Sequence, residues 1–225
     1  MRAAACALGL LLGAAGAQAH PPAASADGVR VGVFRLTYYY VAEERGAGPW
    51  PLYASACDRV LARTSETFHL ELSREGTGRL ADGRLLNFAE RCGCARAGFQ
   101  GGRICYEELD PHRFPWGKGA RHGEGFWPLE PLRSVAVDAG VVPLGVSVYI
   151  PQWRGKRGPD GTILDGCFRA EDTGRLIRGR RLDLFAGRPA WATWLQRRYR
   201  LARVTVYRDA KRCRAVLRAA APRVD

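Results

Sequence analysis

Asp138, Asp172 and Asp183 are the residues of this chain whose type and spacing are most typical of chemistry. Each lies where a short apolar stretch meets a turn, and Asp183 follows Asp172 by eleven residues. A carboxylate directed at an apolar face costs free energy unless it is paired, hydrogen-bonded or protonated. Two such carboxylates that converge share a proton, which leaves one as an acid near neutral pH. The pattern indicates acid–base chemistry, although strand-end aspartates more often cap turns or pair with arginine.

Alternation along the strands assigns these carboxylates to faces. Asp172 has the parity of Ala170, so we expect it on the more apolar face, with Glu171 on the other. Asp183 has the parity of Phe185. The same logic predicts that replacing Glu171 by glutamine lowers turnover only slightly.

Short strands must position the aspartates. Alternation predicts strands at 29–40, 67–72, 134–138, 146–150, 167–171, 182–185 and 202–207, and a hairpin at 79–86 whose Asp82-Gly83 centre suits a two-residue turn. A helix is predicted from Pro189, with Trp191, Trp194 and Leu195 on one face, and a weaker one at 53–62. Many short strands with one or two short helices predict a mainly β fold, a β-barrel.

The segment from Cys92 to Pro131 is rich in glycine, proline and aromatic residues and has little periodicity. We expect a long irregular insertion there, at about 92–131, held by a disulfide. Its Trp116, Phe126 and Trp127 could contact a ligand or simply pack the loop, and the sequence leaves both open.

Composition and charge narrow the class of protein. With 225 residues, 47% hydrophobic and 25% charged, the chain is neither disordered nor collagen-like, and one domain over residues 29–215 is the natural count. Thirty-five basic residues oppose 22 acidic ones, which gives a net charge of +13. Such a chain is attracted to polyanions, including anionic envelope polymers and nucleic acid.

The first residues predict export. Arg2 precedes an uncharged stretch rich in alanine and leucine, and Ala17-Gln18-Ala19 matches a signal-peptidase site. We expect a signal peptide at 1–19, a flexible lead at 20–28, and a monomeric product without stable membrane insertion. The expected location is the periplasm or the outer-membrane side of the envelope, or the exterior by full secretion. Export argues against nucleic acid as the partner.

The cysteines fit an oxidising compartment. Removing residues 1–19 leaves Cys57, Cys92, Cys94, Cys105, Cys167 and Cys213, which predicts up to three disulfides with fifteen possible pairings. Cys92 and Cys94 are poor partners for each other, so we expect each to join a distant segment. A zinc site at Cys92, Cys94 and Cys105 is disfavoured by the single spacer residue, and no metal or cofactor is expected.

Residues 134–187 resemble the 3D (three-aspartate) domain, through AVDAGVVPLGVSVYIP and AEDTGRLIRGRRLDLFAG. That domain is shared by membrane-bound lytic transglycosylase A and stationary-phase-survival cell-wall proteins. Asp138, Asp172 and Asp183 fall on its three aspartate positions. The resemblance implies a double-psi β-barrel whose aspartates line a sugar-binding groove.

The resemblance also implies a lytic transglycosylase that cleaves the bond between N-acetylmuramic acid and N-acetylglucosamine in peptidoglycan. Asp183 would be the single acid/base, Asp172 would hold the proton on it by charge coupling, and Asp138 would orient the pair or the sugar. Candidate substrate contacts are Thr173, Gly174, Arg175, Trp116 and Trp127. Gly174 is expected to turn the loop after Asp172, whereas Arg175 and Leu176 are bulkier than the family pattern. The alternative function is a non-catalytic module that binds peptidoglycan or another polysaccharide.

Overall fold

The computed structural model describes residues 28–218. The predicted signal peptide, its cleavage site and nearly all of the predicted lead lie outside this part of the chain. Within it, no helix is long and apolar enough to cross a membrane.

Six strands close into a barrel in the order β1-β13-β10-β12-β11-β14. They are β1 (Val29–Tyr40), β10 (Ser134–Ala136), β11 (Ser147–Tyr149), β12 (Cys167–Asp172), β13 (Arg181–Gly187) and β14 (Arg203–Arg208). The β1–β13 and β10–β12 pairs are parallel, and the other neighbours are antiparallel. The predicted mainly β fold with a double-psi-type barrel is confirmed, and each strand lies where alternation predicts one.

The barrel interior is filled by the apolar side chains that alternate along these strands. Fully buried members include Phe34, Val135, Phe168, Leu182 and Leu184. The helix α2 (Pro189–Tyr199) begins at the predicted proline and buries Leu195 against this core. Residues of the opposite parity, among them Asp183, therefore lie on the outside of the barrel.

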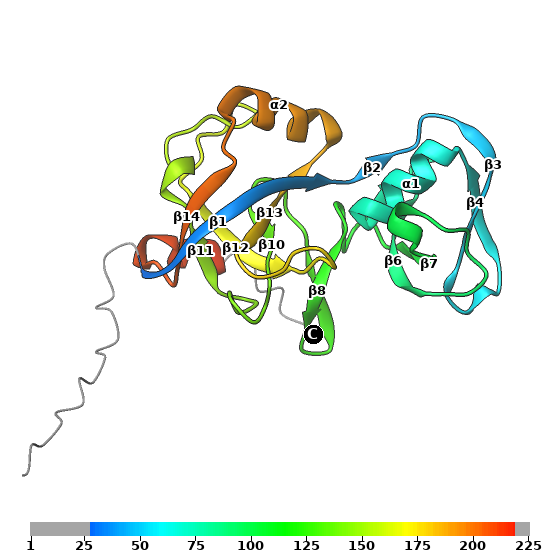
Figure 1. Cartoon of the computed structure of the whole chain (residues 1–225), viewed down its shortest axis with the longest axis horizontal. Helices are drawn as coiled ribbons and strands as arrows, with labels where there is room; N and C mark the ends of the chain where they lie inside the picture. The colour runs from blue at the N-terminus through cyan, green and yellow to red at the C-terminus, as the bar shows by residue number, and fades with distance from the viewer. Residues whose placement is uncertain (1–27, 219–225) are drawn as a thin grey trace, which may run out of the picture.

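A second lobe, built from residues 42–109, lies beside the barrel and continues directly from β1 (Figure 1). Its strands are β2 (Ala42–Glu43), β3 (Ala47–Tyr53), β4 (Val60–Thr64), β5 (Thr77–Arg79), β6 (Leu85–Arg91) and β7 (Ile104–Leu109), and its helix is α1 (Glu66–Glu75). A hairpin of β8 (Lys118–His122) and β9 (Gly125–Pro128) leads back to the barrel. Short helices are η1 (Ser55–Cys57), η2 (Phe99–Gly101), η3 (Pro151–Trp153), η4 (Lys211–Cys213) and α3 (Arg214–Arg218).

Several local predictions in this lobe are wrong. The strand predicted at 67–72 is part of α1, which begins after the N-cap Ser65 and ends at Gly76 in the left-handed conformation. The helix predicted at 53–62 is the end of β3, the short η1 and the start of β4. The predicted irregular, disulfide-tied insertion is found around 92–103 and 110–117, but β7, β8 and β9 interrupt it.

The hairpin predicted around Asp82-Gly83 is confirmed as the β5–β6 pair. Its turn has three residues rather than two, because Leu80 N donates to Arg84 O and Gly83 N donates to Leu80 O. Gly83 has a φ of 92°, a conformation that glycine adopts without strain.

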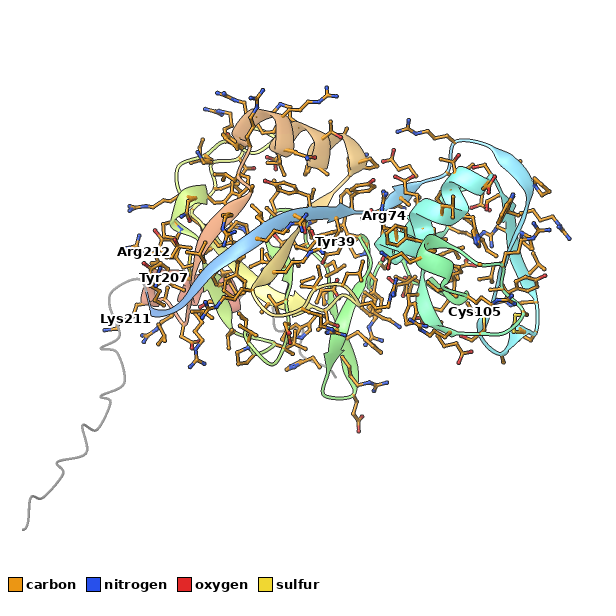
Figure 2. The ribbon with its side chains drawn as sticks, viewed as in Figure 1. Tyr39, Arg74, Cys105, Tyr207, Lys211 and Arg212 are labelled. Atoms are coloured by element: carbon orange, nitrogen blue, oxygen red, sulfur yellow. A yellow bond between two sulfur atoms is a disulfide. The ribbon has the colours of Figure 1, made fainter. Side chains whose placement is uncertain are left out.

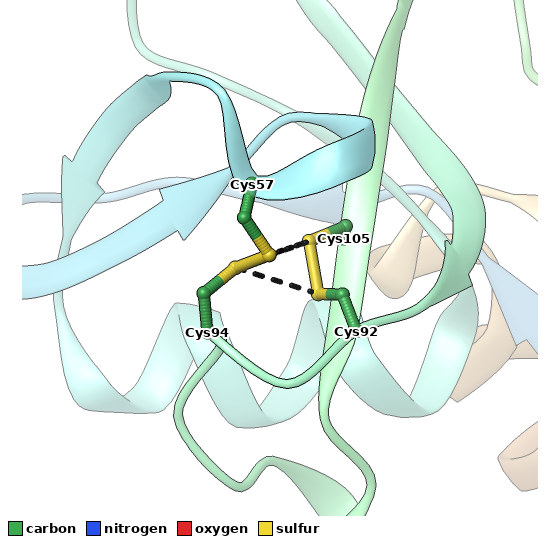
Figure 3. A group of neighbouring side chains, drawn as sticks. All are labelled: Cys57, Cys92, Cys94 and Cys105. Atoms are coloured by element: carbon green, nitrogen blue, oxygen red, sulfur yellow. Dashed lines mark hydrogen bonds between the residues drawn. A yellow bond between two sulfur atoms is a disulfide. The ribbon is translucent and has the colours of Figure 1, made fainter.

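Three disulfides are present, as predicted. Cys57–Cys94 and Cys92–Cys105 fasten the edge of the second lobe, and Cys167–Cys213 ties β12 to η4. Figure 3 shows the first two side by side, with dashed lines from Cys57 to Cys105 and from Cys94 to Cys92. The Sγ atoms of Cys94 and Cys105 are 3.7 Å apart. All four sulfur atoms lie within 4.8 Å of one another, and each is already bonded to another sulfur.

Candidate active site

Asp183 and Asp172 lie in one row across the outer face of the barrel. The short strand β10 runs between β12 and β13, and its Ala136 is opposite Asp172 on one side and Asp183 on the other. On the far side of β13, Thr37 of β1 is opposite Asp183. Neighbouring strands are about 4.8 Å apart, so the two aspartates are separated by about 10 Å of backbone, with Ala136 between them in the row.

A β-bulge in β12 decides which way Asp172 points. Val135 pairs with Ala170 and the next residue, Ala136, pairs with Asp172, so Glu171 is an extra residue in β12. The bulge reverses the alternation and turns Asp172 away from the barrel core that holds Ala170. The predicted face of Asp172 is therefore wrong, and the bulge is what brings it to the face of Asp183.

Asp172 is held by two hydrogen-bond donors. The Tyr39 hydroxyl donates to its Oδ2 over 2.8 Å, and the Thr173 amide donates to its Oδ1 over 2.7 Å. Tyr39 comes from β1, and its ring lies 4.9 Å from that of Phe185, above β13. Burial raises the pKa of Asp172 to about 7, and the charges of Asp183 and Glu171 add to the rise, whereas the two hydrogen bonds oppose it.

Asp183 is the less satisfied of the two carboxylates. Its Oδ1 is buried and has no hydrogen-bond partner in the described part of the chain. Thr37 Oγ1, which belongs to the residue opposite Asp183, is likewise buried and without a hydrogen-bond partner in the described part of the chain. Burial raises the pKa of Asp183 to about 6, and the Arg181 charge opposes the rise. Burial, rather than the predicted coupling to Asp172, is thus the main cause of the rise. A carboxyl with an unsatisfied oxygen is suited to hold a proton and to give it to a ligand.

Asp138 is held by two backbone amides. Its Oδ2 accepts from the Gly179 amide over 2.7 Å and its Oδ1 from the Gly140 amide over 3.0 Å. These bonds hold its pKa below the usual value. Asp138 therefore fixes the loop 173–180, which leads into the strand that carries Asp183.

The same loop carries three predicted contact residues. Thr173 is exposed and donates its amide to Asp172. Gly174 makes the expected turn, since Ile177 N donates to its carbonyl and a Cβ on Gly174 would lie 2.7 Å from Ile177 Cγ1. The exposed Arg175 reaches the second lobe, where its guanidinium donates to Gln100 Oε1 over 2.8 Å. This contact bridges barrel and lobe beside the aspartates.

The two predicted tryptophans have different surroundings. Trp116 is half-buried under the guanidinium of Arg188 and lines a hollow of about 540 Å³ that it shares with Glu43 and Arg79. Trp127 is only 8% exposed and is stacked on His122. Trp116 remains available to a ligand, whereas Trp127 mainly packs the β8–β9 hairpin.

Sequence reasoning missed the ion pair of the residue next to Asp172. Glu171 is 1% exposed, accepts from Arg169 Nε over 2.6 Å and from Ser134 Oγ over 2.7 Å, and so forms a buried ion pair. Its replacement should cost stability, because the Arg169 charge would stay buried without this partner, whereas the small effect expected on turnover stays a prediction. Sequence reasoning also missed Tyr39 and Ala136, although Tyr39 has the parity of Thr37 in a strand that alternation identified.

Part of the barrel sequence also matches a recognised family model. Residues 133–195 match the family model described as the 3D domain. This match covers nearly the span that the three aspartates indicate.

Solved structures with this architecture come from several bacteria, each with a TM-score of 0.52. Escherichia coli MltA with bound chitohexaose is 15% identical, and the match covers 78% of this chain and 71% of that chain. A membrane-bound lytic murein transglycosylase from Agrobacterium tumefaciens is 16% identical, with 79% of this chain and 73% of that chain covered. MltA from Neisseria gonorrhoeae is 15% identical, with 78% of this chain and 72% of that chain covered. At these identities the similarity establishes a shared fold. No curated protein sequence matches the chain.

Proposed function

We propose that the protein is a peptidoglycan lytic transglycosylase with Asp183 as its single acid/base. The observation that carries this proposal is the buried, unpartnered Oδ1 of Asp183, in a row with Asp172 on the outside of a 3D-domain barrel. A carboxyl that is neutral in weakly acidic solution and lacks a partner can protonate a glycosidic oxygen.

The reaction needs only one such group. Asp183 gives its proton to the oxygen between N-acetylmuramic acid and N-acetylglucosamine, and the bond from C1 to that oxygen breaks. The 6-hydroxyl of the same muramoyl residue then bonds to C1, and its proton returns to the Asp183 carboxylate. A glycosidase that uses water needs a second carboxylate as base or nucleophile. Here the nucleophile is already attached to the sugar, so the product is a 1,6-anhydro end and no water is consumed.

The other aspartates act through Asp183. Asp172, fixed by Tyr39 and the Thr173 amide, lies in the same row as Asp183 and would help to hold the proton on Asp183 by charge coupling. Asp138 holds the loop before β13 by its two amide contacts and so positions Asp183. Both are positioning residues in this proposal.

The substrate class and location are also part of the proposal. The similar Escherichia coli protein was solved with bound chitohexaose, an oligosaccharide. A net charge of +13 suits an anionic envelope, and three disulfides suit an oxidising compartment outside the cytoplasm. We propose a monomeric, exported protein that acts on peptidoglycan glycan strands.

Digestion of purified sacculi, followed by mass spectrometry of the released fragments, tests the reaction type. The proposal predicts 1,6-anhydro-muramoyl ends. Reducing muramoyl ends would indicate a hydrolase. Binding to sacculi without release of fragments would indicate the non-catalytic polysaccharide-binding module.

A further inference from the structure

Three arginines lie directly opposite one another on the outer face of the barrel. Arg35 of β1 pairs with Arg181 of β13 on one side and with Arg203 of β14 on the other. The next residues in register, such as Leu36 with Leu182, are in the barrel core. Arg35, Arg181 and Arg203, named here the arginine row, therefore point outward together.

This arrangement is unfavourable for the protein alone. Like charges directly opposite on adjacent strands destabilise a sheet. None of the three arginines forms an ion pair with an acidic residue in the described part of the chain. Arg35 and Arg203 are exposed, and Arg181 has a buried Nε without a partner and a single long bond, of 3.4 Å, from its guanidinium to Leu176 O.

Among the described residues, Asp183 is the acidic residue that lies next to the arginine row along β13. It follows Arg181 by two positions and lies on the same face. Positions i and i+2 of a strand are about 6.6 Å apart, so the row begins one side chain away from the proposed acid/base.

We propose that the arginine row binds carboxylates carried by the substrate, namely those of the peptide stems attached to the muramoyl residues. This inference rests on the proposed function and specifies its substrate class: glycan strands that still carry peptides. The planar guanidinium donates two parallel hydrogen bonds to a carboxylate, and several guanidiniums in a row can engage several carboxylates of one stem. A phosphate group would fit the same donors, so the test includes it.

Binding measured by calorimetry tests the row independently of turnover. The Asp183→Asn protein is titrated with a muramoyl oligosaccharide that carries its peptides, with the same compound after amidation of its carboxylates, and with the peptide-free oligosaccharide. We expect the peptide-bearing ligand to bind about tenfold more tightly than the amidated one, the usual effect of charge-assisted hydrogen bonds at a partly exposed site. Adding Arg35→Gln and Arg203→Gln should remove this difference. Arg197→Gln on α2, which removes an exposed positive charge elsewhere, should preserve it.

Other results would overturn the inference. Equal binding of the amidated and free-carboxylate ligands would do so, as would a preference that survives the double substitution. Inorganic phosphate or polyphosphate that binds the row more tightly than the peptide-bearing ligand would assign the row to phosphate instead. Cleavage of peptide-free strands by the unmodified protein is measured separately. If those strands are cleaved while the binding preference is absent, the proposed function stands and only this inference falls.

Discussion

Asp172 and Asp183 share a face of the barrel but differ in their hydrogen bonds. Asp172 accepts from Tyr39 and from the Thr173 amide, whereas Asp183 keeps a buried oxygen without a partner. Burial raises the pKa of both, to about 7 and about 6. In weakly acidic solution the pair therefore retains protons that ordinary aspartates have lost, and we propose that Asp183 is the one that gives its proton to a ligand.

The pH dependence of activity follows from the pKa of Asp183. The acid must be protonated, so we expect turnover to fall as the pH rises through about 6. The Arg181 charge lowers this pKa, so Arg181→Gln should move the alkaline limb of the kcat profile to higher pH. An unchanged limb in that variant would show that a group other than Asp183 controls it. The exposed Arg197→Gln serves as the control for net charge.

The contribution of Asp172 to stability should change with pH in the opposite sense from that of an ordinary carboxylate, whose pKa falls on folding. Its pKa is higher in the folded protein than in the unfolded chain, so its contribution is most favourable at low pH and is lost as the pH rises through about 7. Asp172→Asn removes a buried negative charge and retains an acceptor for the Thr173 amide. Above pH 7 we expect it to raise Tm by about 2–4 °C, and to do so less at pH 5. Calorimetric scans at the two pH values check this.

Replacing Glu171, in contrast, should destabilise the protein, because Glu171 forms a buried ion pair with Arg169. Glu171→Gln leaves Arg169 buried with only the exposed Glu130 as its charged partner. We expect a loss of about 2 kcal/mol in the free energy of unfolding, less than the full cost of isolating a buried charge because Glu130 remains. The matched variant Glu130→Gln should cost under about 1 kcal/mol. Urea titrations in which both variants cost the same would contradict this account of the pair.

At the scale of elements, β10 is the feature that assembles the site. Three residues long, it puts Ala136 between the two aspartates, and the bulge at Glu171 brings Asp172 to that row. Alternation in the sequence correctly predicts the barrel strands, and the face of Asp183, because it depends on local pattern. It cannot reveal a bulge, since the extra residue is defined only by the partner strand. The same holds for the pairing of Arg35 with Arg181.

The helix α1 shows a second reason why the apolar pattern of a sequence can predict the wrong element. Its short apolar pattern fits a strand as well as a helix, and the helix is specified by its ends, Ser65 at the N-cap and Gly76 at the C-cap. Phe68 and Leu72, four residues apart, then share one buried face. Those end signals are present in the sequence, so this element was predictable from capping rather than from periodicity.

The small size of Ala136 can be tested directly. Ala136→Val adds two methyl groups between Asp172 and Asp183 and obstructs the path by which Tyr39 reaches Asp172. We expect kcat to fall by about 10- to 100-fold, as displacements near 1 Å do. Ala139→Val, an exposed position after the same strand, should leave kcat unchanged. Equal activity of the two variants would show that the space above Ala136 is not used.

At the scale of the whole molecule, the second lobe is attached to the barrel near the aspartates. Glu75 at the end of α1 accepts from the Tyr40 amide over 3.2 Å, and Arg74 donates to the Tyr40 hydroxyl over 3.0 Å. Figure 2 labels Arg74 and Tyr39 where β1 leaves the barrel for the lobe. On the other side, Arg175 of the barrel contacts Gln100 of the lobe. The lobe and the barrel therefore meet at both sides of the row that carries Asp183.

The disulfides of the lobe should stabilise it locally. Cys57→Ser with Cys94→Ser opens a loop of 37 residues, and we expect the free energy of unfolding to fall by about 2–4 kcal/mol. Hydrogen exchange should accelerate in β6 and β7 while β1 and β13 stay protected. Uniform acceleration over the whole chain would indicate that the lobe and the barrel unfold as one unit.

The most direct measurement of the central claim is the release of anhydro-muropeptides from sacculi by the Asp183→Asn protein. This change keeps the size of the side chain and deletes the proton donor, so the protein should fold, with an unchanged circular dichroism spectrum, and its turnover should fall by about two to four orders of magnitude. Asp172→Asn should cost less, because Asp183 remains. If folded Asp183→Asn protein releases anhydro-muropeptides at the original rate, Asp183 is not the acid/base and the proposed mechanism is wrong.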